Sequence, residues 1–275
     1  MQSIPDILYK YYPANRIGYL ENELVRFTQP SELNDPFECL PAINQHFLNY
    51  ITKKARQIDS APYWLNHTYG VAVFGKEVAK RIPDYENLPP SQKKELLETA
   101  KENRRLAFSK FGIFSLSATW KNPLMWAHYT DNHQGVCIGF NSNHEFFQKS
   151  GSSFSDVYTI PVSYTSQRPS IVNSENNQLK NDSWVKFKSK DWGYEEEFRI
   201  LRHLSDPDEK KEPNIYLYRL PHSSIKEIIL GYKSSSDLKN RVKAFCRDNR
   251  LKLYLSQPHE KKYEMSRHQI KSARA

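Results

Sequence analysis

Residues 191–200 read Asp-Trp-Gly-Tyr-Glu-Glu-Glu-Phe-Arg-Ile, and this stretch decides how the rest of the chain is interpreted. The run from Phe198 into Ile200 favours a β-strand, because apolar and charged residues alternate there. Side chains alternate between the two faces of a strand. Three charged side chains are therefore predicted to share one face: Glu195, Glu197 and Arg199.

Two carboxylates on one strand face are costly unless they are solvated, paired with a cation or used in chemistry. From the residues alone, a solvated face paired with Arg199 is the preferred interpretation. The functional alternative is an acidic site. Glu196 is predicted to lie on the other face of the strand, so we expect it to be dispensable.

The composition is that of a folded protein without the common nucleotide-binding loops. The chain has 275 residues, of which 38% are hydrophobic and 26% are charged, and only nine are glycine. Neither glycine-rich phosphate-binding motif is present. The three cysteines, Cys39, Cys137 and Cys246, lie far apart in the sequence. They suit buried thiols in a reducing compartment better than a disulfide framework or a zinc site.

The net charge of +9 favours a polyanionic partner such as nucleic acid. Basic residues occur along the whole sequence, so we expect the charge to be spread rather than gathered in one arm. No secretory signal and no long apolar run are present, which predicts a cytoplasmic protein without membrane contact. The protein partner is not indicated.

The pattern of apolar and turn-forming residues predicts one α+β domain over residues 1–256, followed by a basic tail at 257–275. Residues 43–110 are predicted to be a helical insertion, and the polar segment 165–183 a mobile loop. Strands are expected at 7–12, 24–28, 112–119, 136–140, 161–164, 214–219, 226–231 and 251–255. Shorter helices are expected at 123–131 and 235–248.

Hydroxyl and aromatic side chains cluster in the middle of the chain. Ser115 and Ser117 share one face of a predicted strand, and Trp126, His128 and Tyr129 lie on the helix that follows. The plain interpretation is an aromatic helix packed on a sheet. The functional one is a pocket with an aromatic platform, because aromatic planes suit the stacking of nicotinamide or a base.

Two further features are weaker. Asn34-Asp-Pro-Phe-Glu38 is either a side-chain-stabilised turn or a loop that brings Asp35 and Glu38 to a site. Lys10 interrupts the aromatic strand formed with Tyr9, Tyr11 and Tyr12. It is either an edge residue or a ligand for a carboxylate or phosphate.

Motifs for metal or hydrolytic chemistry are missing. The sequence contains no His-Glu-x-x-His, no Cys-x-x-Cys and no Gly-x-Ser-x-Gly, so we expect no metal ligands of the usual spacing. Clustered carboxylates can bind Mg²⁺. A metal-dependent nuclease therefore stays open as the last-ranked alternative, built on four acidic residues: Asp35, Glu38, Glu195 and Glu197.

Three segments together resemble a bacterial family known as a domain of unknown function (number 2971). They run from Leu8-Tyr-Lys-Tyr to Leu33-Asn-Asp-Pro-Phe-Glu38, from Ser115-Leu-Ser to Gly135-Val-Cys-Ile-Gly-Phe140, and over Trp192-Gly-Tyr-Glu-Glu-Glu-Phe-Arg199. The middle segment includes Met125-Trp-Ala-His-Tyr129.

More distantly, the order of these pieces resembles the ADP-ribosyltransferase superfamily of the histidine-tyrosine-glutamate type. The resemblance implies a split antiparallel β core and NAD as a substrate. Gly112-Ile-Phe-Ser-Leu-Ser-Ala resembles the start of that superfamily's middle segment, and Glu197-Phe-Arg-Ile-Leu its glutamate strand. The first strand departs from the pattern, because Lys10 stands where histidine is expected.

This resemblance implies roles for individual residues. Glu197 would stabilise the positive charge that develops on the ribose as nicotinamide leaves, and Glu195 would orient or deprotonate the acceptor. Arg199 would keep the glutamates ionised. The remaining NAD-binding residues would be Lys10, Tyr11, Ser115, Ser117, Trp126, His128 and Tyr129.

The implied function is an ADP-ribosyltransferase-like protein whose acceptor is nucleic acid or protein, in a bacterial toxin or phage-defence context. The departure at Lys10 supports a competing hypothesis. In that hypothesis the protein keeps the fold with a decayed site and acts as a non-catalytic nucleic-acid-binding or interaction protein.

Overall fold

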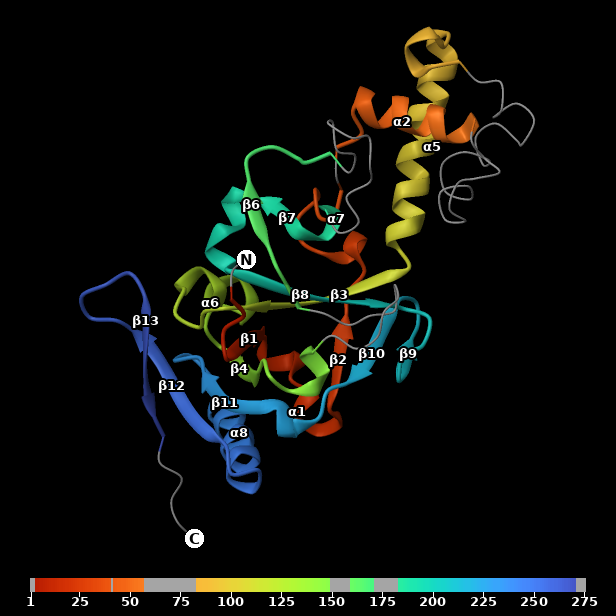
Figure 1. The fold of residues 1–275 in the computed structure, drawn as a ribbon. Helices are drawn as coiled ribbons and strands as arrows, with labels where there is room; N and C mark the ends of the chain where they lie inside the picture. Colours follow the sequence, from red (N-terminus) through yellow and green to blue (C-terminus); the bar gives the residue numbers. More distant parts are fainter. Residues whose placement is uncertain (1–2, 41, 57–82, 149–158, 171–182, 271–275) are drawn as a thin grey trace. The chain divides into compact units, whose positions relative to one another are not determined.

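The computed structural model describes residues 3–40, 42–56, 83–148, 159–170 and 183–270, which form two compact units (Figure 1). Unit 1 comprises Met1–Thr28, Gly112–Val162 and Asp191–Ala275, and unit 2 comprises Gln29–Phe111 and Ser163–Lys190. The expectation of a single domain with an insertion at 43–110 is therefore wrong. The second unit starts earlier, and it also recruits a segment from beyond residue 162.

Unit 1 is built on an eight-stranded sheet in the order β13-β12-β11-β4-β1-β3-β8-β5. The strands are β1 (Ile7–Tyr12), β3 (Phe111–Ser117), β4 (Val136–Asn141), β5 (Thr159–Pro161), β8 (Glu197–His203), β11 (Ile225–Leu230), β12 (Lys252–Pro258) and β13 (Met265–Gln269). β1 lies between β3 and β4 and is antiparallel to both. Gly135 precedes β4, where a Cβ atom would lie 2.0 Å from the Tyr12 carbonyl oxygen.

β11 and β12 are parallel, and α8 (Ser236–Asp248) connects them. Parallel strands need such a crossover, because a tight turn cannot reverse the chain twice. Ser235 begins the helix by accepting a hydrogen bond from the Leu238 amide, as an N-cap should. The sheet is therefore mixed, and together with the helices it shows the α+β class. The finer, ADP-ribosyltransferase-like arrangement stays a prediction.

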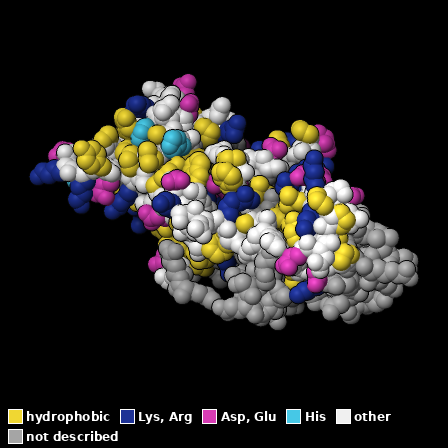
Figure 2. Space-filling view, turned by 90° about the horizontal axis from the view of Figure 1, so that it is seen from above, with side chains coloured by type: hydrophobic (Ala, Val, Ile, Leu, Met, Phe, Trp, Pro, Cys, Tyr) yellow, Lys and Arg dark blue, Asp and Glu magenta, His cyan; other side chains and the backbone are white. Residues whose placement is uncertain are grey.

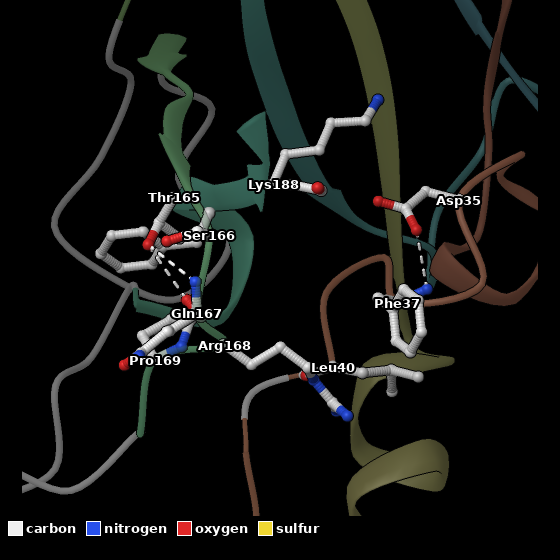
Figure 3. Close-up of a pocket in the computed structure, with 11 residues that line it drawn as sticks. Asp35, Phe37, Leu40, Thr165, Ser166, Gln167, Arg168, Pro169 and Lys188 are labelled. Atoms are coloured by element: carbon white, nitrogen blue, oxygen red, sulfur yellow. Dashed lines mark hydrogen bonds between the residues drawn. The ribbon is translucent and has the colours of Figure 1, made fainter. Parts of the chain in front are cut away.

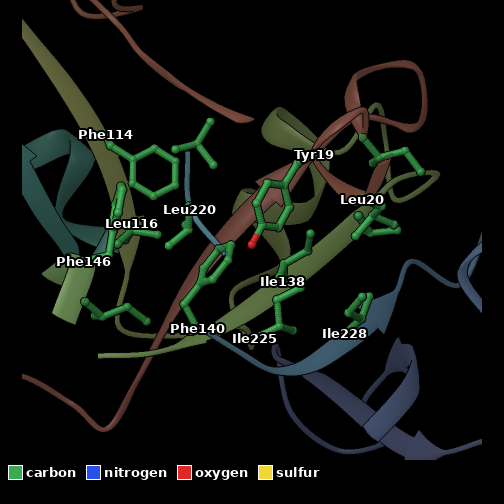
Figure 4. Packing of buried hydrophobic residues seen from close by; sticks show 14 of the residues in the cluster. Tyr19, Leu20, Phe114, Leu116, Ile138, Phe140, Phe146, Leu220, Ile225 and Ile228 are labelled. Carbon is green, nitrogen blue, oxygen red and sulfur yellow. The ribbon is translucent and has the colours of Figure 1, made fainter. Parts of the chain in front are cut away.

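The main core of unit 1 fills one side of this sheet (Figure 4). A second sheet, in the order β2-β10-β9, contributes to the same core. Its strands are β2 (Leu24–Phe27), β9 (Glu209–Lys211) and β10 (Ile215–Arg219), and Phe27 and Tyr218 are buried in that core. α1 (Tyr19–Asn22) and α8 add Tyr19 and Val242.

The opposite side of the eight-stranded sheet carries a smaller aromatic core. Its buried members are Tyr9, Tyr11, Met125, Trp126, Cys137, Ile229 and Met265. Met125 and Trp126 come from α6 (Pro123–Tyr129), whose N-cap Asn122 accepts a hydrogen bond from the Leu124 amide. The aromatic helix predicted at 123–131 is thus confirmed, and it packs on the sheet.

The chain beyond residue 256 is a structured part of unit 1, so the expected tail at 257–275 is wrong as a boundary. β12 runs to Pro258 and pairs with β13 in an antiparallel hairpin, with Pro258 opposite Met265. The Met265 amide also donates to the Lys121 carbonyl at 2.7 Å. Residues 271–275 lie outside the described residues.

Unit 2 is mainly helical in its first segment, as predicted for 43–110. α2 (Gln45–Arg56) and α5 (Pro90–Phe108) are its long helices, and η2 (Pro30–Glu32) and η4 (Tyr85–Asn87) are short 3-10 turns. The second segment supplies α7 (Ser183–Lys186) and two parallel strands, β6 (Ser163–Thr165) and β7 (Phe187–Ser189). Most of the predicted mobile loop, residues 171–182, lies outside the described residues, as do residues 57–82.

Candidate functional site

The glutamate run does not form one strand, which corrects the prediction made for Glu195. Glu195 is the last residue of a 3-10 segment, η6 (Lys190–Glu195), and β8 begins only at Glu197. Glu196 lies between them in the left-handed region with φ of 45°. Its amide bonds to the Gly193 carbonyl at 3.3 Å and its carbonyl accepts from the Ala118 amide at 2.9 Å. These two hydrogen bonds hold the turn.

The burial of the three glutamates nevertheless follows the predicted division. Glu195 is 4% exposed and Glu197 is 5% exposed, whereas Glu196 is exposed. Phe198 and Ile200 point into the main core, so Glu197 and Arg199 occupy the opposite face of β8. We call this side of β3 and β8 the glutamate face; it bears Ser115, Ser117, Glu197 and Arg199.

Glu197 and Arg199 form a buried ion pair on the glutamate face. Arg199 Nε donates to Glu197 Oε1, and Arg199 Nη2 donates to Glu197 Oε2, both at 2.9 Å. The Arg199 side chain is 0% exposed. Two parallel N–H···O bonds favour the ionised carboxylate, because they bind its charged form. Both oxygens of Glu197 are thus shared with Arg199, as the predicted pairing required.

Glu195 is held by different partners. The Tyr129 hydroxyl donates to Glu195 Oε1 at 2.5 Å. The Ser117 hydroxyl donates to the Glu195 carbonyl oxygen at 2.6 Å. Ser117 therefore fastens the main chain of Glu195 to β3, and its geometry is that of a positioning residue. The half-buried Ser115 lies on the same face of β3.

The predicted stacking residues Tyr11 and Trp126 are buried in the small aromatic core. Trp126 is fully buried, and its indole nitrogen donates to the Trp120 carbonyl at 2.7 Å. The Tyr11 hydroxyl donates to the Thr119 carbonyl at 2.9 Å, and burial raises its pKa well above the usual range. Neither ring is placed to stack on a ligand.

Partly exposed aromatic rings beside Glu195 were missed by sequence reasoning. Tyr194 lies with its ring centroid 6.1 Å from that of His128 and 6.1 Å from that of Trp192. His128 in turn lies 6.5 Å from Tyr129. The signal was available, because Trp192 and Tyr194 stand in the same short segment as the glutamates.

Lys10 is not brought together with these residues. Alternation along β1 places it on the main-core side with Leu8, whereas Tyr9 and Tyr11 face the aromatic core. Its amine donates to the Ser115 carbonyl at 2.8 Å and lies 5.1 Å from the centre of the Phe114 ring. The lysine that was expected to hold NAD therefore lies on the face opposite Glu197.

Unit 2 contains a cavity of about 250 Å³ (Figure 3). Asp35 and Phe37 line one side, residues 165–169 another, and Lys188 lies between them. Arg168 reaches across toward Leu40, and its Nε donates to the Leu40 carbonyl at 2.8 Å. Asp35 thus reaches a cavity, as one sequence interpretation allowed. Its Oδ1 also accepts from the Phe37 amide at 2.9 Å, as the turn interpretation predicted.

Glu38, the second acidic residue of that turn, forms a buried ion pair with Lys188 at 3.5 Å. Within the described ranges, no group of three or more His, Cys, Asp or Glu side chains could hold a metal ion. The nuclease alternative therefore gains no support. All three cysteines are buried thiols. No helix in the described part of the chain has the length and apolar character needed to cross a membrane.

Comparison with known proteins gives one match. A protein-family model described as "Protein of unknown function (DUF2971)" matches residues 125–200. No curated protein and no solved structure matches the chain. The matched segment contains Tyr129 and the whole glutamate run. Over residues 125–200 the chain therefore belongs to the family of unknown function DUF2971, as its motifs predicted.

Proposed function

We propose that the protein is an ADP-ribosyltransferase-like protein that uses NAD as a substrate. One observation carries the proposal: the buried carboxylate of Glu195 is held by the Tyr129 hydroxyl beside the glutamate face. A fixed, desolvated carboxylate is suited to stabilise a cation that develops during a reaction. The departure of nicotinamide from the ribose of NAD produces such a cation.

The geometry moves the catalytic role from Glu197 to Glu195. Arg199 bridges both oxygens of Glu197, so a ribose hydroxyl would have to displace a buried two-point ion pair. At Glu195 a ribose hydroxyl would compete with a single donor, Tyr129, at Oε1. Glu197 and Arg199 then support the strand that follows the catalytic turn.

The chemistry requires one bond to break and one to form at the same ribose carbon. The bond between the ribose and nicotinamide breaks, and nicotinamide leaves with the bonding electrons. Glu195 stabilises the resulting positive charge, and a nucleophile of the acceptor, which loses a proton, bonds to the ribose carbon. The partly exposed rings of Tyr194 and His128 provide the stacking surface for nicotinamide.

A nicotinamide-release assay tests this proposal. The full chain is incubated with labelled NAD, with and without nucleic acid, beside three variants: Glu195→Gln, Glu197→Gln and Glu196→Gln. We expect Glu195→Gln to lower release by about 100-fold, the scale of one lost electrostatic contact in a transition state. The exposed neighbour Glu196 is the matched control, and its variant should release nicotinamide at the rate of the unchanged chain.

Two results contradict the proposal. The first is the absence of nicotinamide release from the unchanged chain under every condition. The second is release that Glu195→Gln and Glu196→Gln affect equally. Thermal unfolding of each variant separates loss of activity from loss of fold, which matters most for Glu197→Gln because its partner Arg199 is buried.

A non-catalytic interaction protein is the second candidate, and specific observations favour it. Lys10 faces the main core, and Trp126 is fully buried. Both departures affect residues that the resemblance assigns to NAD. Under this hypothesis the acidic turn is structural, NAD is neither bound nor cleaved, and the partner is nucleic acid or protein. The bacterial toxin or phage-defence context stays a prediction under both candidates.

A further inference from the structure

The positive charge of the chain is concentrated near its C-terminal end, which corrects the expectation that it is spread. Residues 233–275 contain twelve Lys or Arg against four Asp or Glu. The first 232 residues contain 28 basic and 27 acidic residues, which nearly cancel. The net charge of the last 43 residues is therefore +8 of the total +9.

The described part of this segment is α8, β12 and β13, and we call their exposed basic side chains the basic surface. It consists of Lys233, Arg241, Lys243, Arg247, Arg250, Lys252, Lys261 and Lys262. In Figure 2 dark blue side chains lie along the left margin, the side on which Figure 1 draws the β12–β13 hairpin. The apolar side of α8 packs Val242 and Cys246 into the main core, so its basic side faces outward.

Nearby acidic residues do not cancel this charge. Arg247 pairs with Asp248, and Lys262 lies 3.7 Å from Glu264, but these side chains are well exposed except for the partly exposed Glu264. Exposed pairs contribute little and exchange readily with other anions. Across the described ranges, Lys243 and Lys261 form no ion pair.

The loop between β12 and β13 adds an aromatic residue to the basic surface. Tyr263 follows Lys261 and Lys262, and its side chain is 105% exposed, so it packs against no neighbour. The loop is ordered nonetheless, because the His259 amide donates to the Glu264 carbonyl at 2.9 Å. A fully exposed tyrosine at an ordered turn has apolar area to offer a partner.

The base of the hairpin is fixed to the sheet. Arg267 forms an ion pair with Glu227. Its guanidinium lies 4.1 Å from the centre of the Tyr254 ring and 4.5 Å from that of Trp120. These contacts hold β13 against β12 and hence present the loop in one orientation. Preorganisation of this kind lowers the entropic cost of binding.

We propose that the basic surface binds single-stranded nucleic acid, with Tyr263 stacking on a base. Exposed Lys and Arg side chains contact phosphates, and an aromatic ring among them stacks on unpaired bases without sequence preference. An anionic membrane is the weaker alternative. The loop His259-Glu-Lys-Lys-Tyr-Glu264 contains no aliphatic residue, and membrane-surface binding needs a wide apolar face. This inference goes beyond NAD chemistry and does not depend on it.

Fluorescence anisotropy with a labelled oligonucleotide about 20 nucleotides long, single-stranded or duplex, tests the proposal at several salt concentrations. We expect Lys261→Ala with Lys262→Ala to flatten the dependence of log affinity on log salt by roughly 1.4 for the single strand, about 0.7 for each phosphate contact. Tyr263→Ala should weaken single-strand binding roughly tenfold without changing that slope, and Tyr263→Phe should retain binding.

The matched control is a second pair of adjacent exposed lysines in unit 1, Lys210 and Lys211 of β9. Replacing both with alanine should leave affinity and salt slope unchanged. An equal loss in this control would overturn the proposal, since general charge would then explain binding. So would the absence of binding at low salt, a preference for duplex that Tyr263→Ala does not affect, or binding only to vesicles containing phosphatidylserine.

Discussion

Two buried Glu–Arg pairs lie on the same side of the eight-stranded sheet, and they differ in how the chain brings them together. Glu197 and Arg199 are two residues apart on β8. Glu227 and Arg267 are 40 residues apart on β11 and β13, and the Tyr9 hydroxyl also donates to Glu227 at 3.0 Å. The first pair is local, whereas the second ties three strands together.

The two pairs also differ in exposure. The side chains of Arg199 and Glu197 are 0% and 4% exposed, whereas that of Arg267 is 21% exposed. An ion that loses its partner costs more where water cannot replace that partner. The comparison teaches that the local pair fixes the strand beside the candidate site, and the long-range pair fixes the hairpin that carries the basic surface.

The largest effect is expected at the local pair. Arg199→Ala leaves the Glu197 carboxylate buried without its bidentate partner, so we expect a loss of about 3–5 kcal/mol in the free energy of unfolding. Urea denaturation measures this loss. A loss smaller than that of Arg267→Ala would break the comparison.

A smaller effect is expected at the long-range pair. Arg267→Ala should cost about 2 kcal/mol, because Tyr9 still donates to Glu227 and water reaches the site. Hydrogen exchange should quicken in β13 and leave β8 unchanged, since only the hairpin loses its anchor. Equal quickening in both strands would show that the pair supports the whole sheet.

Alkaline pH should distinguish the pairs further. Burial, followed by the charge of Glu227, raises the pKa of Tyr9 above its usual value of 10.0. Above pH 10 the unfolded chain loses this proton and the folded chain keeps it, so stability falls as pH rises, by about 1.4 kcal/mol per pH unit for this group. Tyr9→Phe should remove that part of the slope. An unchanged slope above pH 10 would contradict the assignment.

The smallest effect on stability is expected beside Glu195. Tyr129→Phe removes one hydrogen bond to a carboxylate at a half-buried ring, which should cost about 1 kcal/mol. Nicotinamide release should fall more steeply than stability, because the same hydroxyl positions Glu195. Thermal unfolding and the release assay on one preparation give both values, and full activity in this variant would separate Tyr129 from the site.

The local features could be predicted from the sequence, and the long-range ones could not. The strand at 7–12 and the shared face of Glu197 and Arg199 follow from alternation over a few residues. The turn at Glu196 could not be foreseen, because a hydrogen bond from the distant Ala118 holds its left-handed conformation.

The same physical reason explains the other misses. Lys261 and Lys262 give residues 259–264 the composition of a frayed tail, and only the pairing of β13 with β12 and the contacts of Arg267 make them a hairpin loop. Unit 2 combines residues 29–111 with 163–190, and a pattern read along the chain does not join segments that far apart. Lys10 was placed by resemblance, whereas alternation along β1 already assigned it to the side of Leu8.

One measurement tests the central claim, that Glu195 is the functional carboxylate and the Glu197–Arg199 pair is structural. Replacing the pair together, with Glu197→Leu and Arg199→Met, removes both charges and keeps the volume, which is often neutral for a buried pair. We predict a folded variant that releases nicotinamide from NAD within a few-fold of the unchanged chain. A folded variant as inactive as Glu195→Gln would contradict the account and return the catalytic role to Glu197.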